Sequence, residues 1–169
     1  MAKSKPLPPL EELQKVLSYD PETGVFIWRC SKGTQREDSV AGSINSSLGY
    51  RIIQLNGVRW YAHRLAWLFA TGEDPGNLTV DHINRDRRDN RLVNLRLATH
   101  TQQNVNQGLA SNNKSGFRGV SWSKVNNKWL ASIAINGKGK HLGYFATKEE
   151  AAEAYQKAAA DYFGEFLAS

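Results

Sequence analysis

The sequence predicts an α+β fold of two modules, the second of which is a three-stranded antiparallel sheet packed on one helix. In residues 129–135 apolar side chains alternate, which is typical of a strand with one buried face. Asn136-Gly137 then supplies the turn for a returning strand over 138–145. A capping box at Thr147-Lys148-Glu149-Glu150 starts a helix directly afterwards.

The helix after the capping box completes the second module. Its predicted apolar stripe is Ala151, Ala154, Tyr155, Ala158 and Tyr162, with Gly164 as C-cap. Residues 118–123 are the third expected strand, and Trp129 is expected in the core. One face of the sheet is therefore left for a partner.

The first module shows shorter elements. Leu10, Leu13 and Leu17 have helical spacing, and Asn56-Gly57 joins two alternating segments into a hairpin. The predicted elements are strands at 25–28, 50–55, 58–61 and 78–80 and a helix at 62–70. Residues 1–9 form a Lys/Pro-rich arm, and the small polar stretch 108–115 is expected to link modules 10–107 and 116–169.

Composition narrows the function classes. No apolar run approaches the roughly 20 residues of a membrane span, so no membrane partner is expected. A lone Cys30 excludes an intramolecular disulfide and predicts a reducing cytoplasm. The net charge of +6 favours a polyanionic partner. Residues 111–145 hold six basic residues and no acid. Judged by charge alone, this stretch is explained equally well by a solvated surface and by a face that binds a polyanion.

Residues that carry chemistry gather after the strand at 78–80. Asp81-His82 is followed by Asn94 at 12 residues from His82 and by Asn104 at 22 residues. An isolated Asp-His pair is more often a surface pair than a site, but the ordered asparagines and the strings DNR and NLR favour a functional motif.

The string DHINRDRRDNRLVNLRLATHTQQN resembles the homing and phage branch of the HNH endonucleases. The preceding strings YDPETGVFIW and GYRIIQLNGVRWYAHRLAWLFATG are similar to what precedes the motif in that branch. The resemblance implies a ββα-metal nuclease fold with its core motif at 78–107.

The same resemblance assigns roles to individual residues. Asp81 and Asn104 are expected to bind one divalent cation, and their oxygen ligands suit Mg²⁺ or Mn²⁺. His82 is expected to be the general base, and the amide of Asn94 to hold the loop around it. Two roles stay open for His100, which could assist the metal or start a helix. His63 is expected to be structural, and no paired ligand spacing suggests zinc.

The loop of this motif is rich in arginine. Its guanidinium groups are suited to bidentate contacts with DNA phosphates, and the predicted contacts are Arg85, Arg87, Arg88 and Arg91.

Residues 116–167 resemble the APETALA/ethylene-response-factor DNA-binding domain. The matching strings are GFRGV, KWLASI, HLGYF and TKEEAA, followed by Ala154-Tyr155 and Ala158-Ala159. The resemblance implies a sheet that lies in the major groove. The expected DNA contacts are Arg118, Ser121, Trp122, Lys128, Ser132, Lys138, Lys140 and His141. Ser121, Ala134 and Gly139 replace arginines of that family, so its site preference does not transfer.

The combined hypothesis is a metal-dependent endonuclease acting on double-stranded DNA, with 5′-phosphate and 3′-hydroxyl products. It is expected in the cytoplasm of a bacterial or phage-infected cell, associated with the nucleoid. The alternative is a non-catalytic DNA-binding protein or regulator on a nuclease scaffold. An RNA-binding or nucleoid protein would require exposed sheet aromatics. A monomer would nick and a dimer would cut both strands, and the sequence leaves this choice open.

Overall fold

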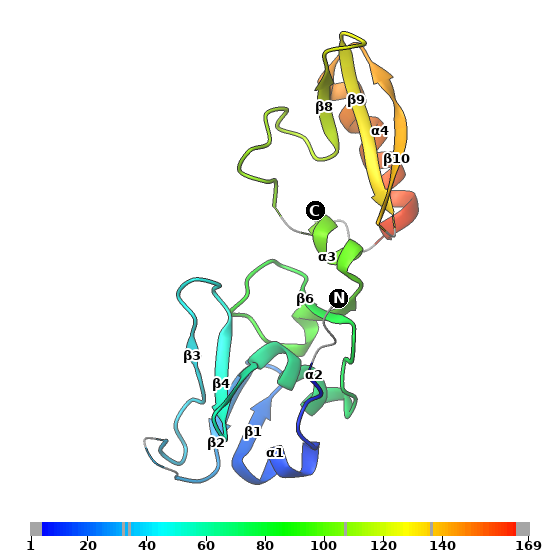
Figure 1. Cartoon of the computed structure of the whole chain (residues 1–169). Coiled ribbons are helices and arrows are strands. Elements are labelled where there is room, and N and C mark those ends of the chain that lie inside the picture. The colour runs from blue at the N-terminus through cyan, green and yellow to red at the C-terminus, as the bar shows by residue number, and fades with distance from the viewer. Residues whose placement is uncertain (1–4, 32, 34, 107, 136, 165–169) are drawn as a thin grey trace. The chain divides into compact units, whose positions relative to one another are not determined.

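The computed structural model describes residues 5–31, 33, 35–106, 108–135 and 137–164, without the side chains of His100 and Val105. Contacts divide the chain into two compact units, Met1–Ala98 and Thr99–Ser169 (Figure 1). This boundary precedes the stretch 108–115, which was expected to be the linker. The functional division into modules 10–107 and 116–169 stays a prediction. Residues 1–4 of the expected arm and 165–169 of the second module lie outside the described residues.

In the described residues of the first unit, three antiparallel sheets and two α-helices are present. Its sheets are β1-β2, β3-β4-β5 and β6-β7. The elements in chain order are α1 (Leu10–Val16), β1 (Leu17–Asp20), β2 (Val25–Trp28), β3 (Ser43–Ile44), β4 (Arg51–Leu55), β5 (Val58–Tyr61), α2 (Ala62–Thr71), β6 (Thr79–His82), the 3₁₀ helix η1 (Leu92–Asn94) and β7 (Leu95–Ala98).

One hydrophobic core joins these elements. Phe26 of β2, Ile53 of β4 and Leu65 of α2 are completely buried in it. Val80 of β6 and Leu95 of β7 belong to the same core. The strands that carry the candidate motif are therefore anchored by apolar burial, the dominant favourable term in folding.

The first unit differs from the sequence prediction at the point where the first helix ends and β1 begins. Leu17 was expected to continue the first helix, but it begins β1 and pairs with Trp28 of β2. Burial explains the difference, because Leu17 has no exposed surface as the first residue of the strand. The helical spacing of the leucines did not distinguish a helix end from a strand start.

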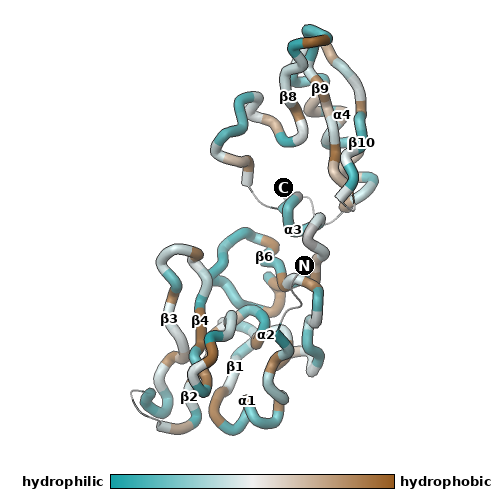
Figure 2. Tube along the Cα trace, in the orientation of Figure 1, coloured by the Kyte–Doolittle hydropathy of each residue, from teal (hydrophilic) through white to brown (hydrophobic). Residues whose placement is uncertain are grey.

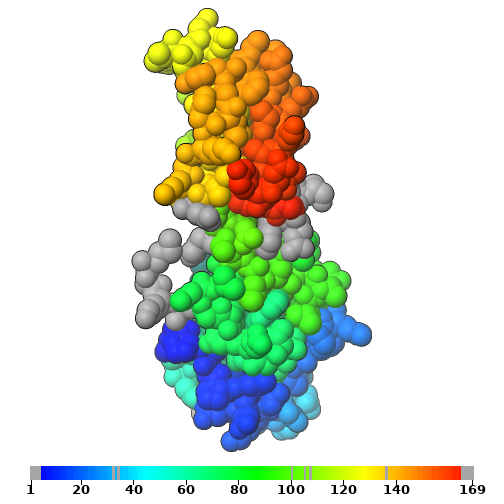
Figure 3. Space-filling model, turned by 90° about the vertical axis from the view of Figure 1, so that its right-hand side faces the viewer, coloured from blue at the N-terminus to red at the C-terminus, as the bar shows by residue number. Residues whose placement is uncertain are grey.

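The second unit contains a short helix, a sheet and a long helix. The elements are α3 (His100–Asn106), β8 (Val120–Ser123), β9 (Lys128–Ile135), β10 (Lys138–Phe145) and α4 (Lys148–Phe163). The antiparallel sheet has the order β10-β9-β8, and α4 packs on it. Figure 3 shows the yellow and orange atoms of β10 beside the orange and red atoms of α4. Mixed α and β content was predicted, and both units have it.

The start of α4 has the predicted capping box. Thr147 Oγ1 accepts from the Glu150 amide at 3.2 Å, and Glu150 Oε2 accepts from the Thr147 amide at 3.2 Å. The buried side of the helix differs in part from the predicted stripe, because Ala154 and Ala158 are half-buried and Tyr162 is exposed. The buried stripe keeps the predicted Ala151 and Tyr155 and continues at every fourth residue with Ala159 and Phe163, and Ala152 is buried beside it.

Trp129 packs against the core between the sheet and α4, as predicted. None of the helices in the described part of the chain has the length and apolar character needed to cross a bilayer.

Replacing Thr147 with Ala should lower the free energy of unfolding of the second unit by about 1 kcal/mol, because the first turn of α4 loses its side-chain cap. Thr147→Ser keeps the hydroxyl and serves as the control. Urea unfolding followed by circular dichroism measures the difference, and equal midpoints for the Ala and Ser variants would contradict the capping role.

Candidate active site

The hairpin β6–β7 positions the candidate catalytic residues. Val80 and Leu95 point into the core, so their neighbours along each strand face away from it. Asp81 and Arg96 are cross-strand partners, and His82 is paired with Leu95. The Asp-His pair thus stands at the carboxyl end of β6, where the loop begins.

Asp81 is a buried carboxylate in an ion pair. It is 6% exposed, and its Oδ2 accepts from both Nε and Nη2 of Arg96 at 3.3 Å. The two side chains are 8% and 13% exposed. A carboxylate at this depth requires a cationic partner, because an isolated buried charge is costly. Sequence reasoning assigned no role to Arg96, although the string NLR contains it.

His82 is also buried, at 4% exposure. Its ring lies edge-on to His63 at 5.1 Å between centroids and 5.8 Å from the ring of Tyr50. Asn90, itself 1% exposed, supplies a polar contact of 3.3 Å between its Oδ1 and His82 Nε2. These neighbours make the surroundings of the imidazole polar and aromatic.

The Asn90 contact indicates a tautomer for His82. Asn90 Nδ2 donates to the carbonyl oxygen of Arg88 at 3.3 Å, which turns Oδ1 towards the imidazole. An amide oxygen only accepts, so this geometry favours the proton on Nε2 and the lone pair on Nδ1. Burial lowers the pKa of His82 below 6.5, against the raising effects of the Asn90 hydrogen bond and the Asp81 charge. The ring is therefore neutral near pH 7.

His63, expected to be structural, is buried at the N-terminal end of α2. Its ring stacks on Tyr61 at 5.4 Å and lies 5.0 Å from Tyr50. Burial, followed by the neighbouring His82 and Arg64, lowers the pKa of His63 to about 3. Among the described residues its Nδ1 has no hydrogen-bond partner. Sequence reasoning did not foresee that His63 touches His82, since the two are joined only through the packing of α2 against β6.

Asn94 closes the loop between β6 and β7. Its Oδ1 accepts from the Asn84 amide at 2.9 Å, and its Nδ2 donates to the Asp89 carbonyl at 2.8 Å. Its own carbonyl accepts from the Ile83 amide at 2.9 Å. This is the loop-holding geometry expected from the resemblance, and a part in catalysis stays a prediction.

The hairpin β1–β2 supports the same loop from outside. Tyr19 Oη donates to the Asn90 carbonyl at 2.8 Å, and the Leu92 amide donates to Pro21 at 3.1 Å. Gly24 has φ +72°, and a Cβ there would lie 2.5 Å from Arg91 N. The approach is possible only for glycine. The string YDPETG thus contributes a brace for the loop that holds Asn90.

The four loop arginines divide into two pairs. Arg87 donates to the Leu48 carbonyl at 2.9 Å and covers the ring of Tyr50 at 4.8 Å. Arg91 binds both carboxylate oxygens of Asp89, at 2.8 and 2.6 Å. Arg85 and Arg88 are exposed and make no recorded side-chain contact with described residues. The segment that follows β6 is mainly hydrophilic in Figure 2. Among its four arginines, only Arg85 and Arg88 present their guanidinium groups to solvent without a recorded partner among the described residues.

Asn104, the second expected metal ligand, lies exposed on α3 in the second unit, whereas Asp81 belongs to the first. Their meeting around a cation stays a prediction. The donor set fits the expected ion, because carboxylate and amide oxygens suit Mg²⁺ or Mn²⁺. No group of three His, Cys, Asp or Glu side chains in the described ranges is arranged to hold a metal. An ion that keeps several waters and substrate oxygens needs no such group.

Arg118 holds the end of α3. Its Nη1 donates to the Asn104 carbonyl at 2.9 Å, and its Nη2 donates to the Gly108 carbonyl at 3.1 Å. A cation at the carbonyl end of a helix is favourable. Arg118 thus has partners within the second unit, and its expected contact with DNA stays a prediction.

The strand register divides the other expected DNA contacts between the two faces of the second sheet. Val120 and Ala131, which are cross-strand partners, face α4. By alternation the predicted contacts Trp122, Lys138 and Lys140 share that face, and Lys140 Nζ donates to Tyr162 Oη of α4 at 2.8 Å. The open face carries the remaining four predicted contacts, Ser121, Lys128, Ser132 and His141.

Sequence reasoning missed two residues on this open face. Leu130 pairs with Ser121 on one side and with Tyr144 on the other. Tyr144 is 44% exposed, and its ring lies 4.8 Å from His141. The row of alternating positions 130, 132 and 134 contained the signal for Leu130, and the register shift at Gly143 concealed Tyr144.

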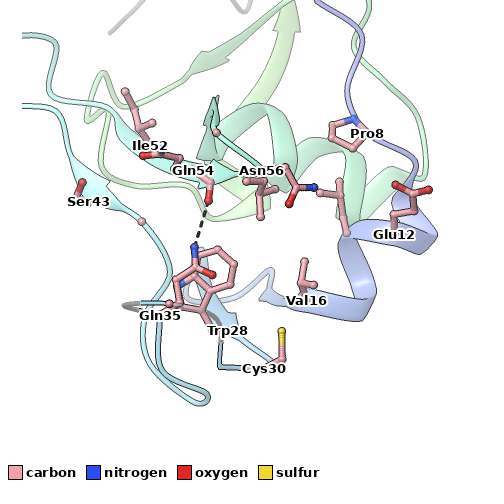
Figure 4. Close-up of a pocket in the computed structure, with 15 residues that line it drawn as sticks. Pro8, Glu12, Val16, Trp28, Cys30, Gln35, Ser43, Ile52, Gln54 and Asn56 are labelled. Atoms are coloured by element: carbon pink, nitrogen blue, oxygen red, sulfur yellow. Dashed lines mark hydrogen bonds between the residues drawn. The ribbon is translucent and has the colours of Figure 1, made fainter.

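A separate cavity of about 630 Å³ lies in the first unit between α1, β2 and β4 (Figure 4). Trp28, Cys30 and Gln54 are among its lining residues, and Gln35 Nε2 donates to the Gln54 carbonyl across it at 3.4 Å. No predicted site residue lines it.

The segment that carries the motif is similar to one known family. Residues 60–105, which include the end of β5, α2, the hairpin β6–β7 and most of α3, match the HNH endonuclease family. The matched segment contains Asp81, His82, Asn94 and Asn104.

Two curated relatives share a larger part of the chain. An uncharacterized HNH endonuclease, L560, of Acanthamoeba polyphaga mimivirus is 37% identical over 107 residues, which is 63% of this chain and 54% of the relative. Protein 3.8 of Escherichia phage T7 is 34% identical over 76 residues, 45% of this chain and 63% of the relative. The chain thus spans between about half and two thirds of these proteins.

A solved structure described as DNA binding and cleavage by the HNH homing endonuclease I-HmuI covers 97% of this chain and 84% of its own. The identity is 18% and the TM-score 0.45. At that similarity it supports no conclusion beyond the likeness.

The burial of His63 predicts a pH-dependent stability. The unfolded chain takes up a proton near pH 6.5, whereas folded His63 does so only near pH 3. The free energy of unfolding should therefore fall as the pH decreases through this window, by up to about 1.4 kcal/mol per pH unit from this residue. His63→Phe, which keeps an aromatic ring, should remove that contribution. Urea unfolding at several pH values tests this, and parallel curves for both proteins would contradict it.

Proposed function

We propose that this chain, which carries an HNH endonuclease domain over residues 60–105, is a metal-dependent endonuclease that hydrolyses phosphodiester bonds in duplex DNA. The observation that carries the proposal is the position of Asp81 and His82 within that segment. They stand at the end of β6, beside a loop that Asn94 closes from both sides. A rigid hairpin holding a carboxylate next to a neutral imidazole is a suitable arrangement for activating water.

His82 is the proposed general base. Its neutral state near pH 7 follows from burial, and the Asn90 contact directs its Nδ1 lone pair to the task of accepting a proton. Asn90 is proposed as the group that orients the ring. A base that is held in one rotamer and one tautomer stays in the reactive geometry for more of the time than a mobile base does.

Asp81 and Asn104 are the proposed metal ligands. A bound Mg²⁺ or Mn²⁺ would stabilise negative charge on the phosphate and on the leaving oxygen. The buried carboxylate of Asp81 provides a negative charge on the first unit, and the exposed amide of Asn104 provides an uncharged oxygen. Placing both on one cation is part of the proposal.

The proposed reaction is an in-line displacement at phosphorus. His82 Nδ1 accepts a proton from water while the water oxygen forms a bond to the phosphorus. The bond from phosphorus to the 3′ oxygen breaks, and that oxygen takes a proton from a second water molecule. The products are a 5′-phosphate and a 3′-hydroxyl.

The open face of the second sheet is the proposed DNA-holding surface, and its likeness to the APETALA/ethylene-response-factor domain supports this part of the proposal. Lys128 and His141 are exposed there, beside the serine hydroxyls of Ser121 and Ser132. Lysine contacts with phosphates position a protein without reading sequence. Arg85 and Arg88 of the catalytic loop are proposed to contact flanking phosphates. Relatives in a phage and a virus suggest action within an infected host cell.

DNA binding without cleavage is the second candidate. It is favoured by the low exposure of His82, 4%, and by the engagement of Asp81 with Arg96. The two candidates make opposite predictions for His82, because a non-catalytic protein does not depend on its imidazole.

Replacing His82 with Ala should reduce nicking or cutting of supercoiled plasmid in Mg²⁺ by about 100- to 10,000-fold, because the general base is lost. Binding to a duplex should stay within a few-fold of the unmodified protein. Val93→Ala, at a position that is 80% exposed, is the control for substitution in the same hairpin. Cleavage by the His82→Ala protein at the normal rate would refute the base assignment, and no cleavage by any form would favour the second candidate.

Lys128→Ala should lower the slope of log affinity against log salt concentration by about 0.9, since one phosphate contact is lost. Lys140→Ala is the matched control, because Lys140 binds Tyr162 on the helix side of the sheet. Fluorescence anisotropy with a labelled duplex measures both slopes. Equal slopes for the two variants would contradict the assignment of the open face.

A further inference from the structure

Arg96 differs from the other paired arginines in the depth of its ion pair. Among the ion pairs recorded between described residues, Arg96–Asp81 is the one in which both side chains are at most 13% exposed. In the pair Arg91–Asp89 the guanidinium is 48% exposed. Removing the cation from a buried pair leaves an uncompensated charge, whereas an exposed partner is replaced by water.

The geometry of the Arg96 contact is looser than its burial suggests. Nε and Nη2 both approach the same oxygen, Oδ2 of Asp81, at 3.3 Å. Arg91 instead places Nε on Oδ1 and Nη2 on Oδ2 of Asp89, at 2.8 and 2.6 Å. Charge-assisted hydrogen bonds of this kind are usually about 2.7–2.9 Å long. The contacts of Arg96 Nε and Nη2 with Asp81 Oδ2 are therefore longer than those of a firmly held pair.

This combination, a required positive charge and a loose contact, suits a cation that is replaced by another. A buried carboxylate must be neutralised whether or not a metal is bound. The 3.3 Å contacts to Oδ2 reduce the loss when the carboxylate turns to a second cation. A tight two-oxygen pair, such as Arg91–Asp89, would make that exchange more costly.

We propose, building on the function above, that Arg96 is a positioning residue that neutralises Asp81 in the metal-free protein and competes with the divalent cation for this carboxylate. Arg96 stabilises the metal-free state more than the metal-bound state. Because a group that favours the free state weakens binding, Arg96 lowers the metal affinity of the protein. Metal binding in the absence of DNA is weak for this reason.

Direct binding of Mn²⁺, followed through the electron paramagnetic resonance signal of the free ion, tests the proposal on the full chain. Arg96→Gln should bind Mn²⁺ about tenfold more tightly than the unmodified protein, because a neighbouring positive charge is removed. Arg96→Lys keeps the charge and should bind with nearly the original affinity. Arg91→Gln is the matched control and should stay within about twofold.

Thermal unfolding gives a second measurement, which does not depend on activity. Arg96→Gln should melt at a lower temperature than the unmodified protein without metal, and Mn²⁺ should raise its melting temperature by more. A variant that is unfolded without metal and folds on addition of Mn²⁺ also supports the proposal. One that stays unfolded in saturating Mn²⁺ contradicts it, because the ion should then replace the guanidinium.

Equal or weaker Mn²⁺ binding by Arg96→Gln overturns the competition, as does binding by neither protein. Asp81→Asn separates this failure from failure of the proposed function. If Asp81→Asn binds Mn²⁺ as well as the unmodified protein, Asp81 is not a metal ligand and the metal assignment itself is wrong. If it loses binding while Arg96→Gln is unchanged, only the role of Arg96 fails.

Discussion

The side-chain amide of Asn94 is the interaction on which the candidate site depends most. It accepts from Asn84 and donates to Asp89, so the two ends of the loop after β6 are held together by one residue. Val80 and Leu95 bury the strands on either side of this loop in the core. The hydrophobic effect therefore sets where the hairpin lies, and directional hydrogen bonds set how the loop leaves it. Asn90 meets His82 because both conditions are satisfied.

Three layers of support surround His82. The amide of Asn90 contacts the imidazole, Tyr19 holds the backbone of Asn90, and Gly24 lets the hairpin β1–β2 approach closely enough for that contact. The family match begins at residue 60, so Tyr19 and Gly24 lie outside it. The N-terminal hairpin is therefore a structural part of the site although it carries none of the proposed chemistry.

Sequence patterns predicted the local elements of this protein better than its contacts. The alternation over 129–135 and the capping box at Thr147 each depend on neighbouring residues, and the structure has both. The Asp-His motif likewise stands where the resemblance placed it, at the end of a strand. The hydrogen-bond partners of Arg87, Arg118 and Lys140 come from distant segments, so the residues next to them in the sequence give no signal for these contacts. The partners are the Leu48 carbonyl, the Asn104 carbonyl and the Tyr162 hydroxyl, respectively. The sequence shows that a side chain is positively charged, but it does not show which group the side chain contacts in the fold.

The net charge of +6 includes basic side chains that already make contacts within the fold. These are Arg87, Arg91, Arg118 and Lys140. Each of these side chains donates hydrogen bonds within the protein, which restricts the conformations in which it could contact another molecule. The ionic atmosphere that a nucleic acid sheds on binding depends on cations that actually reach its phosphates. Four basic side chains are thus engaged within the fold, so the count of basic residues overstates how many of them can turn freely toward a partner outside the protein.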